Sequence, residues 1–200
     1  MWRLDDDDSK DDDKDQDNEK GFMQQMLKSR TIFVAEEVSD KLYKKVASTI
    51  TLLEQADAVA PIYVYVNSPG GSADSGFAIY DLLRFTSCPI ITLANGIVAS
   101  SAVLIYLAGE QERLALPHAR FLLHQPSTYA RGQASDIDIT AKEIRKIRDR
   151  YNMVVEKHTG KPMATVQADA DRDFWLNAEE SVKYGLVQRI VEHKSELNNK

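Results

Sequence analysis

Short apolar runs alternate with segments of helical periodicity from residue 21 onward, and this alternation limits the possible folds more than any other feature. The runs 61–66 and 89–94 are rich in β-branched residues and tyrosine, as buried strands are. A Gly-Gly turn and a helix at about 74–85 lie between them, and a long amphipathic helix is predicted at 135–157. Strands joined by crossover helices predict an α/β fold.

The remaining elements follow the same alternation. Three further short apolar runs predict strands at 31–35, 113–116 and 121–124. A second helix is predicted from apolar residues at helical spacing, namely Leu42, Val46, Ile50 and Leu53. Either Ser39 or Asp40 is available as its N-cap. A last short helix is bracketed by Asn177, with Glu180 three residues later, and by Gly185.

Charge is concentrated at the start of the chain. Residues 1–20 carry ten acidic and four basic side chains, a net charge of −6 that equals that of the whole chain. Because this segment has almost no apolar residues, we expect a disordered tail at 1–20 and one domain at 21–200. The tail is a solvated extension, a gate, a metal-attracting patch or an added segment. The balanced charge of the remainder argues against a nucleic-acid partner.

The compartment is predicted from three features. Cys88 is the single cysteine, so no internal disulfide forms and a reducing compartment is compatible. Residues 1–20 hold no apolar run typical of a secretory signal. The longest apolar-rich segment, 98–108, is too short to span a bilayer. We therefore expect a soluble cytoplasmic protein that does not bind membranes.

Three separated positions have contexts suited to nucleophilic catalysis. Ser100 follows a turn of small residues and begins an apolar helix, whose free first-turn N–H groups favour a developing oxyanion. His124 ends a short apolar strand. Asp173 precedes Phe174 and Trp175, whose bulk is expected to bury its carboxylate. A serine hydroxyl needs a base with a pKa near neutrality, and an imidazole oriented by a carboxylate is such a base.

The chain resembles the Clp protease proteolytic subunit family over about residues 22–192, through motifs that occur in the family's order. They are Asn67-Ser68-Pro69-Gly70-Gly71, the segment 96–109, His124-Gln125-Pro126, the segment 132–137, and Asp171-Arg172-Asp173 followed by Tyr184-Gly185-Leu186. Several collinear motifs are far more specific than one isolated serine–glycine turn. The resemblance implies a crotonase-like spiral of ββα units with a handle helix.

The resemblance also implies the roles of the site residues. Ser100 corresponds to the nucleophile, His124 to the general acid/base and Asp173 to the orienting carboxylate. The backbone N–H groups of Gly71 and Ser101 correspond to the oxyanion hole. The implied activity is that of an ATP-independent serine endopeptidase subunit that degrades unfolded polypeptides, without a metal or another cofactor.

Assembly and partners are implied in the same way. The family forms two stacked heptameric rings, a tetradecamer that encloses the active sites and receives substrates from an AAA+ unfoldase. The positions that correspond to inter-ring contacts are Gln133, Asp136, Asp171 and Arg172. Three aromatic residues correspond to the pocket between subunits where the unfoldase docks, namely Tyr63, Tyr65 and Phe85.

Two departures from the family pattern support an alternative. Family members generally have Met and Gly after the nucleophile, where this chain has Ser101 and Ala102, and the family's axial-pore segment is not visible before Gly21. The alternative is a structural or regulatory subunit, inactive alone, that joins a second paralogue in mixed rings. A third possibility is an acyl-CoA enzyme of the crotonase superfamily, which would not require the Ser/His/Asp set. The remaining histidines are predicted at the surface, namely His118, His158 and His193.

Overall fold

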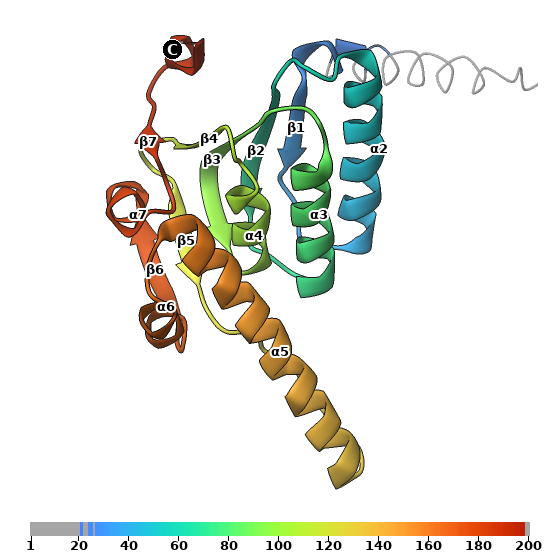
Figure 1. Cartoon of the computed structure of the whole chain (residues 1–200), viewed down its shortest axis with the longest axis vertical. Helices are drawn as coiled ribbons and strands as arrows, with labels where there is room; N and C mark the ends of the chain where they lie inside the picture. The colour runs from blue at the N-terminus through green and yellow to red at the C-terminus, as the bar shows by residue number, and fades with distance from the viewer. Residues whose placement is uncertain (1–20, 22–23, 26, 199–200) are drawn as a thin grey trace, which may run out of the picture.

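The centre of the sheet is formed by β2 (Ile62–Ser68) and β3 (Ile90–Ala99), most of whose side chains are buried. The computed structural model describes residues 21, 24–25 and 27–198, and the predicted tail at 1–20 lies outside them. In the described part, parallel strands run in the order β1 (Thr31–Val34), β2, β3, β4 (Glu112–Ala115) and β7 (Arg189–Ile190) (Figure 1).

The long strand β3 pairs with two different strands along its length. Its first half pairs with β4, whereas its last residues pair with β5 (Arg120–Leu123). In turn β5 pairs with β6 (Phe174–Asn177), and this pair is antiparallel. The sheet therefore branches at β3, and one branch is the short run β3, β5, β6.

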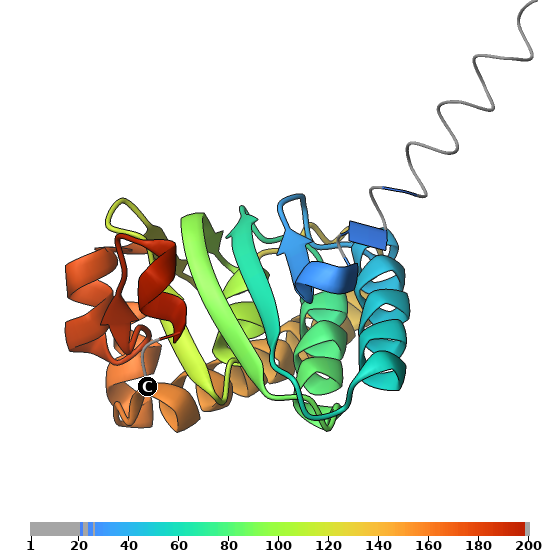
Figure 2. The same cartoon turned by 90° about the horizontal axis from the view of Figure 1, so that it is seen from above.

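Three helices, α2 (Asp40–Ala56), α3 (Ala73–Phe85) and α4 (Ser101–Leu107), cover one face of the sheet (Figure 2). Their apolar side chains and those of β2 and β3 form one core. Every residue of α4 is buried, so this helix lies inside the molecule. Of the two predicted N-caps of α2, Ser39 is the cap, because its hydroxyl accepts a hydrogen bond of 3.3 Å from the Leu42 N–H.

The helix α5 (Ala134–Thr159) is 26 residues long, and its first part projects beyond the body of the molecule (Figure 1). Only its C-terminal half is anchored, through the buried residues Tyr151, Asn152 and Val155. The chain then forms α6 (Met163–Asp169), β6, α7 (Ala178–Tyr184), β7 and the short helix η1 (Lys194–Asn198). The predicted mixed α/β fold with a handle helix is therefore confirmed.

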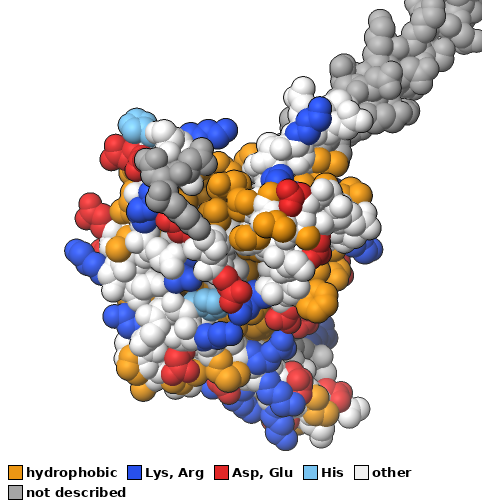
Figure 3. Space-filling view, turned by 45° about the horizontal axis from the view of Figure 1, so that its top comes forward, with side chains coloured by type: hydrophobic (Ala, Val, Ile, Leu, Met, Phe, Trp, Pro, Cys, Tyr) orange, Lys and Arg blue, Asp and Glu red, His pale blue; other side chains and the backbone are white. Residues whose placement is uncertain are grey.

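The other face of the sheet carries a second, smaller apolar cluster. It consists of Ile91, Leu93, Leu114 and Val191, with Tyr63, Tyr65, Leu116 and Leu197 packed against it. Because side chains alternate along a strand, Ile91 and Leu93 point away from the helices, whereas the residues next to them in β3 point toward the helices. Hydrophobic side chains gather between the two ends of the described chain on the face seen in Figure 3. Within the described residues, no helix is both long and apolar enough to cross a membrane.

Candidate active site

Three strands bring the predicted triad residues to one edge of the sheet. Ser100 follows the end of β3, His124 follows the end of β5, and Asp173 precedes the start of β6. Because β3 and β5 are parallel while β6 is antiparallel to β5, these three positions lie on the same side. The carboxyl ends of parallel strands are the usual place for a site in an α/β sheet. The pairing thus explains how residues so far apart in sequence converge.

The backbone of Ser100 is held in a strained conformation. Its φ is 56° and its ψ is −127°, a combination that residues with a Cβ rarely adopt. The turn between strand and helix that this conformation produces resembles the nucleophile elbow of other hydrolases. Such a conformation persists only where its surroundings fix it.

Hydrogen bonds from three elements fix the strained turn. The Ser100 N–H donates to the Leu122 carbonyl oxygen of β5, at 3.0 Å. The Ser100 carbonyl oxygen accepts from the Val103 N–H at 3.0 Å and from the Tyr151 hydroxyl of α5 at 3.3 Å. Because Leu122 lies two residues before His124, the first of these bonds also sets the position of the serine relative to the histidine.

His124 and Asp173 contact each other directly. The distance from His124 Nδ1 to Asp173 Oδ1 is 3.2 Å. The prediction that aromatic residues bury Asp173 is wrong, since its side chain is 64% exposed and that of His124 is 28% exposed. The two aromatic residues that follow Asp173 belong to β6 and contact other side chains: the Phe174 ring lies against the Tyr184 ring, and the Trp175 ring lies against the Arg120 guanidinium.

Ser100 and His124 line the same cavity, which has a volume of about 280 Å³. Its other lining residues come from the Gly-Gly turn and from α3, α4, α5 and the segment after β5, namely Gly71, Ser72, Ala73, Asp74, Phe77, Ser101, Leu104, Pro126, Ser127, Ile144, Ile147 and Tyr151. The described hydrogen bonds do not include one between Ser100 and His124. The predicted oxyanion-hole residues Gly71 and Ser101 line the same cavity as Ser100.

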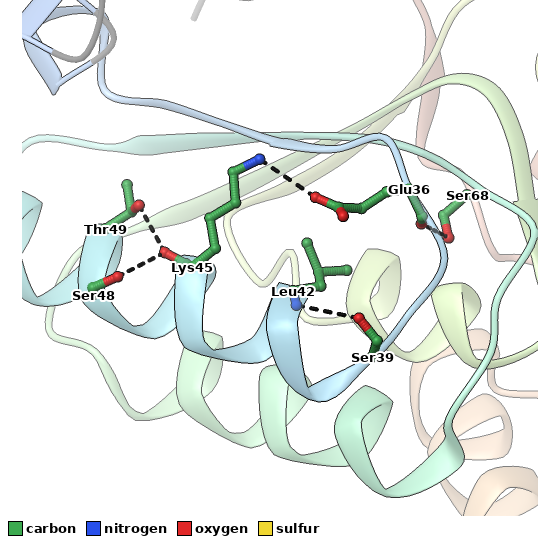
Figure 4. A network of polar contacts seen from close by, with 7 residues as sticks. All are labelled: Glu36, Ser39, Leu42, Lys45, Ser48, Thr49 and Ser68. Carbon is green, nitrogen blue, oxygen red and sulfur yellow. Dashed lines mark hydrogen bonds and ion pairs between the residues drawn. The ribbon is translucent and has the colours of Figure 1, made fainter. Parts of the chain in front are cut away.

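The Gly70-Gly71 turn is fixed against the segment before α2. The Ser68 hydroxyl donates to the Glu36 carbonyl oxygen at 2.6 Å and accepts from the Gly70 N–H at 3.2 Å, and Figure 4 shows the first of these bonds. A Cβ on Gly70 would lie 2.6 Å from the Ala99 carbonyl oxygen, so only glycine allows this close approach to the turn at Ser100. Gly71 forms an isolated bridge with Val38. No hydrogen bond among the described residues uses the Gly71 N–H.

Ser101 contributes its main chain and a small side chain. Its side chain is 4% exposed, and its hydroxyl oxygen is buried without a hydrogen-bond partner among the described residues. A Cβ on Gly76 would lie 2.9 Å from the Ser101 Cβ, so this side chain fills the contact between α3 and α4. As the first residue of α4, Ser101 has an N–H without a partner inside that helix.

The predicted assembly residues form two groups, one at the start of α5 and one between α6 and β6. Gln133 is the N-cap of α5 and Asp136 lies in its first turn. Asp171 and Arg172 form an exposed ion pair of 3.2 Å. The Gln125 side-chain amide donates to the Asp171 carbonyl oxygen at 2.9 Å, so the residue after His124 is tied to the segment that leads to Asp173.

The predicted docking residues are only partly brought together. Tyr63 and Tyr65 pack against the apolar cluster on the open sheet face, and Phe33 lies beside Tyr65 with ring centroids 5.2 Å apart. Phe85 lies instead at the end of α3 and is 87% exposed. Within one chain, Phe85 is therefore not part of the group that the two tyrosines form.

Tyr151 contacts the site although its sequence context did not predict this, and His158 does not lie at the surface as predicted. In the sequence, Tyr151 occurs at the helical spacing that is typical of core residues. Burial raises the pKa of its hydroxyl far above the usual range, so the hydroxyl stays protonated and donates to the Ser100 carbonyl oxygen. His118 and His193 are exposed, as predicted, but His158 is half-buried, with its Nε2 2.8 Å from the Tyr80 hydroxyl. No group of three or more potential ligands for a metal ion was found among the described residues.

A serine at a strained strand–helix turn, in one cavity with a histidine that contacts an aspartate, is the arrangement of a Ser–His–Asp hydrolase on an α/β sheet. The family model for Clp protease matches residues 14–194. The chain is therefore a member of the Clp protease family.

Individual relatives agree with this assignment. The chain is 41% identical over 184 residues to the ATP-dependent Clp protease proteolytic subunit 2 of Treponema denticola, a match that covers 92% of both proteins. It is 42% identical to the proteolytic subunit 3 of Rhizobium johnstonii, with 97% of this chain and 100% of that protein covered. The structure of a substituted ClpP1 from Listeria monocytogenes superposes with a TM-score of 0.83 and 34% identity, covering 88% of this chain and 99% of that one.

Proposed function

We propose that this chain is a serine endopeptidase subunit that cleaves unfolded polypeptides, with Ser100, His124 and Asp173 as its catalytic triad. The observation that carries the proposal is the convergence of these residues at one sheet edge, with Ser100 held in a strained turn beside the cavity. Strained backbone conformations of this kind cluster at active sites, where they orient a functional side chain.

Proton transfer follows from the contacts of His124. Because Nδ1 faces the Asp173 carboxylate, Nε2 is the nitrogen left to take the proton from Ser100. The Ser100 oxygen then attacks the substrate carbonyl carbon, and His124 gives the proton to the leaving amine as the C–N bond breaks, which leaves an acyl ester on Ser100. A water molecule that His124 deprotonates then attacks this ester, and the proton returns to Ser100 as the carboxylic acid product leaves. Asp173 holds the ring in this tautomer and stabilises the imidazolium. No cofactor is needed for these steps.

The oxyanion that forms during attack requires donors that are already oriented. We assign this role to the backbone N–H groups of Gly71 and Ser101, which lie on the same cavity as Ser100. One such donor contributes roughly 2.7–4 kcal/mol to transition-state stabilisation. The role needs only the Ser101 main chain, so a serine in place of the family's usual methionine is compatible with activity.

Assembly into two stacked heptameric rings is part of the proposal. The projecting part of α5 exposes the apolar side chains of Ile137 and Ile139, which are 41% and 59% exposed, near Gln133 and Asp136. Exposed apolar residues on a projecting helix are typical of a surface that another subunit covers. Asp171 and Arg172 would couple ring contact to the triad through the Gln125 hydrogen bond.

We further propose that an AAA+ unfoldase delivers substrates and that the protein works in the cytoplasm. The open sheet face with Tyr63 and Tyr65 offers an apolar docking surface. Phe85, exposed at the end of α3, would complete that surface from a neighbouring subunit of the ring.

One observation favours the second candidate, a structural or regulatory subunit that joins a second Clp paralogue. In the single chain, the described hydrogen bonds do not link Ser100 to His124, and Asp173 is largely exposed. In this candidate the chain has the same fold and the same ring contacts, but the paralogue cleaves the peptides.

Peptide hydrolysis by the purified chain alone, together with its mass in solution, tests the proposal. We expect hydrolysis of a fluorogenic peptide by the assembled protein and a loss of about 10⁴-fold or more in Ser100→Ala. Assembly without hydrolysis, followed by hydrolysis only in mixtures with a paralogue, would favour the regulatory subunit. Hydrolysis that persists in Ser100→Ala would contradict the triad.

A further inference from the structure

The cavity beside Ser100 contains one carboxylate whose role the triad does not explain. Asp74 lies in the first turn of α3, is exposed, and lines the cavity together with Ser100 and His124. No hydrogen bond or ion pair joins its side chain to another described residue. No lysine or arginine belongs to the cavity lining within the described part of the chain. The carboxylate is therefore available to a molecule that enters the cavity.

Much of the cavity wall is apolar, although Ser72 and Ser127 also line it. Phe77 lies three residues further along α3, on the same side of the helix as Asp74. Leu104 of α4 and Ile144 and Ile147 of α5 add to this apolar lining. A long side chain that enters the cavity thus meets hydrocarbon along its length and a negative charge at the α3 end. Lysine and arginine have that composition, with an apolar stem and a cationic head.

We propose that Asp74 makes the cavity select a basic residue of the polypeptide substrate. This inference rests on the proposed endopeptidase function and specifies its substrates further. An acidic residue in a helix's first turn also interacts favourably with the helix dipole, and that effect alone needs no substrate. The two roles differ in one measurable respect, because only substrate selection makes peptide binding depend on the charge of a peptide side chain.

The size of the preference follows from elementary electrostatics. Opposite unit charges about 4 Å apart in an exposed site attract by about 1 kcal/mol, which corresponds to about fivefold in binding. The attraction between exposed charges weakens as salt shortens the Debye length to a few ångströms near 1 M. We therefore expect about fivefold tighter binding of a lysine peptide than of its norleucine counterpart at low salt, and a smaller ratio at high salt.

Binding to the full-length Ser100→Ala protein tests the inference without depending on hydrolysis. Labelled peptides that carry lysine, norleucine or glutamate at each of the positions flanking one fixed cleavable bond would be titrated by fluorescence anisotropy. The same titrations would be made with Asp74→Asn and with Asp81→Asn added to the Ser100→Ala protein. Asp81 is the matched control, because it is exposed on the same helix but lies outside this cavity.

The inference predicts a lysine preference, at one or more positions, that survives Asp81→Asn and disappears in Asp74→Asn. Thermal unfolding of both variants checks that each is folded. Equal binding of lysine and norleucine peptides, or a lysine preference that survives Asp74→Asn, would overturn it and leave Asp74 with its helix role. An Asp74-dependent preference in a chain whose wild type cleaves no peptide would support this inference while the endopeptidase proposal fails.

Discussion

Replacing Ser100 with glycine should leave a more stable protein than replacing it with alanine. Both variants lack the hydroxyl, so they differ in how well they tolerate a φ of 56° and a ψ of −127° and in the freedom of the unfolded chain. Relief of a strained conformation of this kind raises the free energy of unfolding by about 1–3 kcal/mol. The greater conformational freedom of glycine in the unfolded chain lowers the free energy of unfolding by about 0.4–1 kcal/mol. The net difference is about 1 kcal/mol in favour of glycine, or about 2–4 °C in melting temperature for a protein of this size.

Scanning calorimetry on both variants in the same oligomeric state measures this difference. Ser101 supplies the control, because it has helical geometry and glycine is unfavourable there by roughly 0.5–1 kcal/mol relative to alanine. Ser101→Gly should therefore melt below Ser101→Ala, the opposite order. If Ser100→Gly melts at or below the temperature of Ser100→Ala, the turn is not strained and the argument that ties strain to the nucleophile position fails.

Three other predictions concern stability and assembly. The pKa of His158 is lowered from about 6.5 to about 4, first by burial and then by the charges of Arg113, Arg84 and Lys157. Between these two pH values the unfolded chain therefore binds a proton at His158 that the folded chain does not bind. Stability should fall as pH drops from about 6.5 to about 4, by about 1–2 kcal/mol for a half-exposed ring, and His158→Gln should reduce this loss in urea titrations. Arg113→Met should cost about 3 kcal/mol by urea unfolding, since the guanidinium donates to the carbonyl oxygens of Leu186 at 2.8 Å and His158 at 3.2 Å. Arg172→Glu should weaken ring–ring association, measured by analytical ultracentrifugation, and should lower peptide hydrolysis at the same time. Intact double rings with normal activity would exclude the proposed coupling between ring contact and the triad.

The sheet and the long helix were predictable because they depend on local patterns. Apolar runs gave β2 and the start of β3, and Ser39, Asn177 and Gly185 marked helix ends that the structure confirms. By contrast, β6 was not predicted, since a strand of four residues next to charged neighbours has no clear periodicity. Its antiparallel pairing with β5 is a tertiary feature, and together with the Gln125 hydrogen bonds it places Asp173 beside His124.

The site shows the same division between local and tertiary information. The contexts of Ser100 and His124 are local, so both residues could be selected from sequence as candidates for the site, whereas their roles remain proposals. The Tyr151 bond to Ser100 joins residues 51 positions apart, and a tyrosine at core spacing gives no sign of it. Nor does sequence spacing report solvent exposure, which is why Asp173 was predicted to be buried although its side chain is 64% exposed.

Labelling with a serine-directed fluorophosphonate, followed by mass spectrometry of the modified peptide, tests the central claim most directly. The triad account predicts one adduct on Ser100 in the assembled wild-type protein, and strongly reduced labelling in His124→Ala, because the base that activates the hydroxyl is removed. Ser101 is the internal control, since it is adjacent to Ser100 but buried between α3 and α4. An adduct on Ser101, or labelling of Ser100 that is unaffected by His124→Ala, would contradict the account.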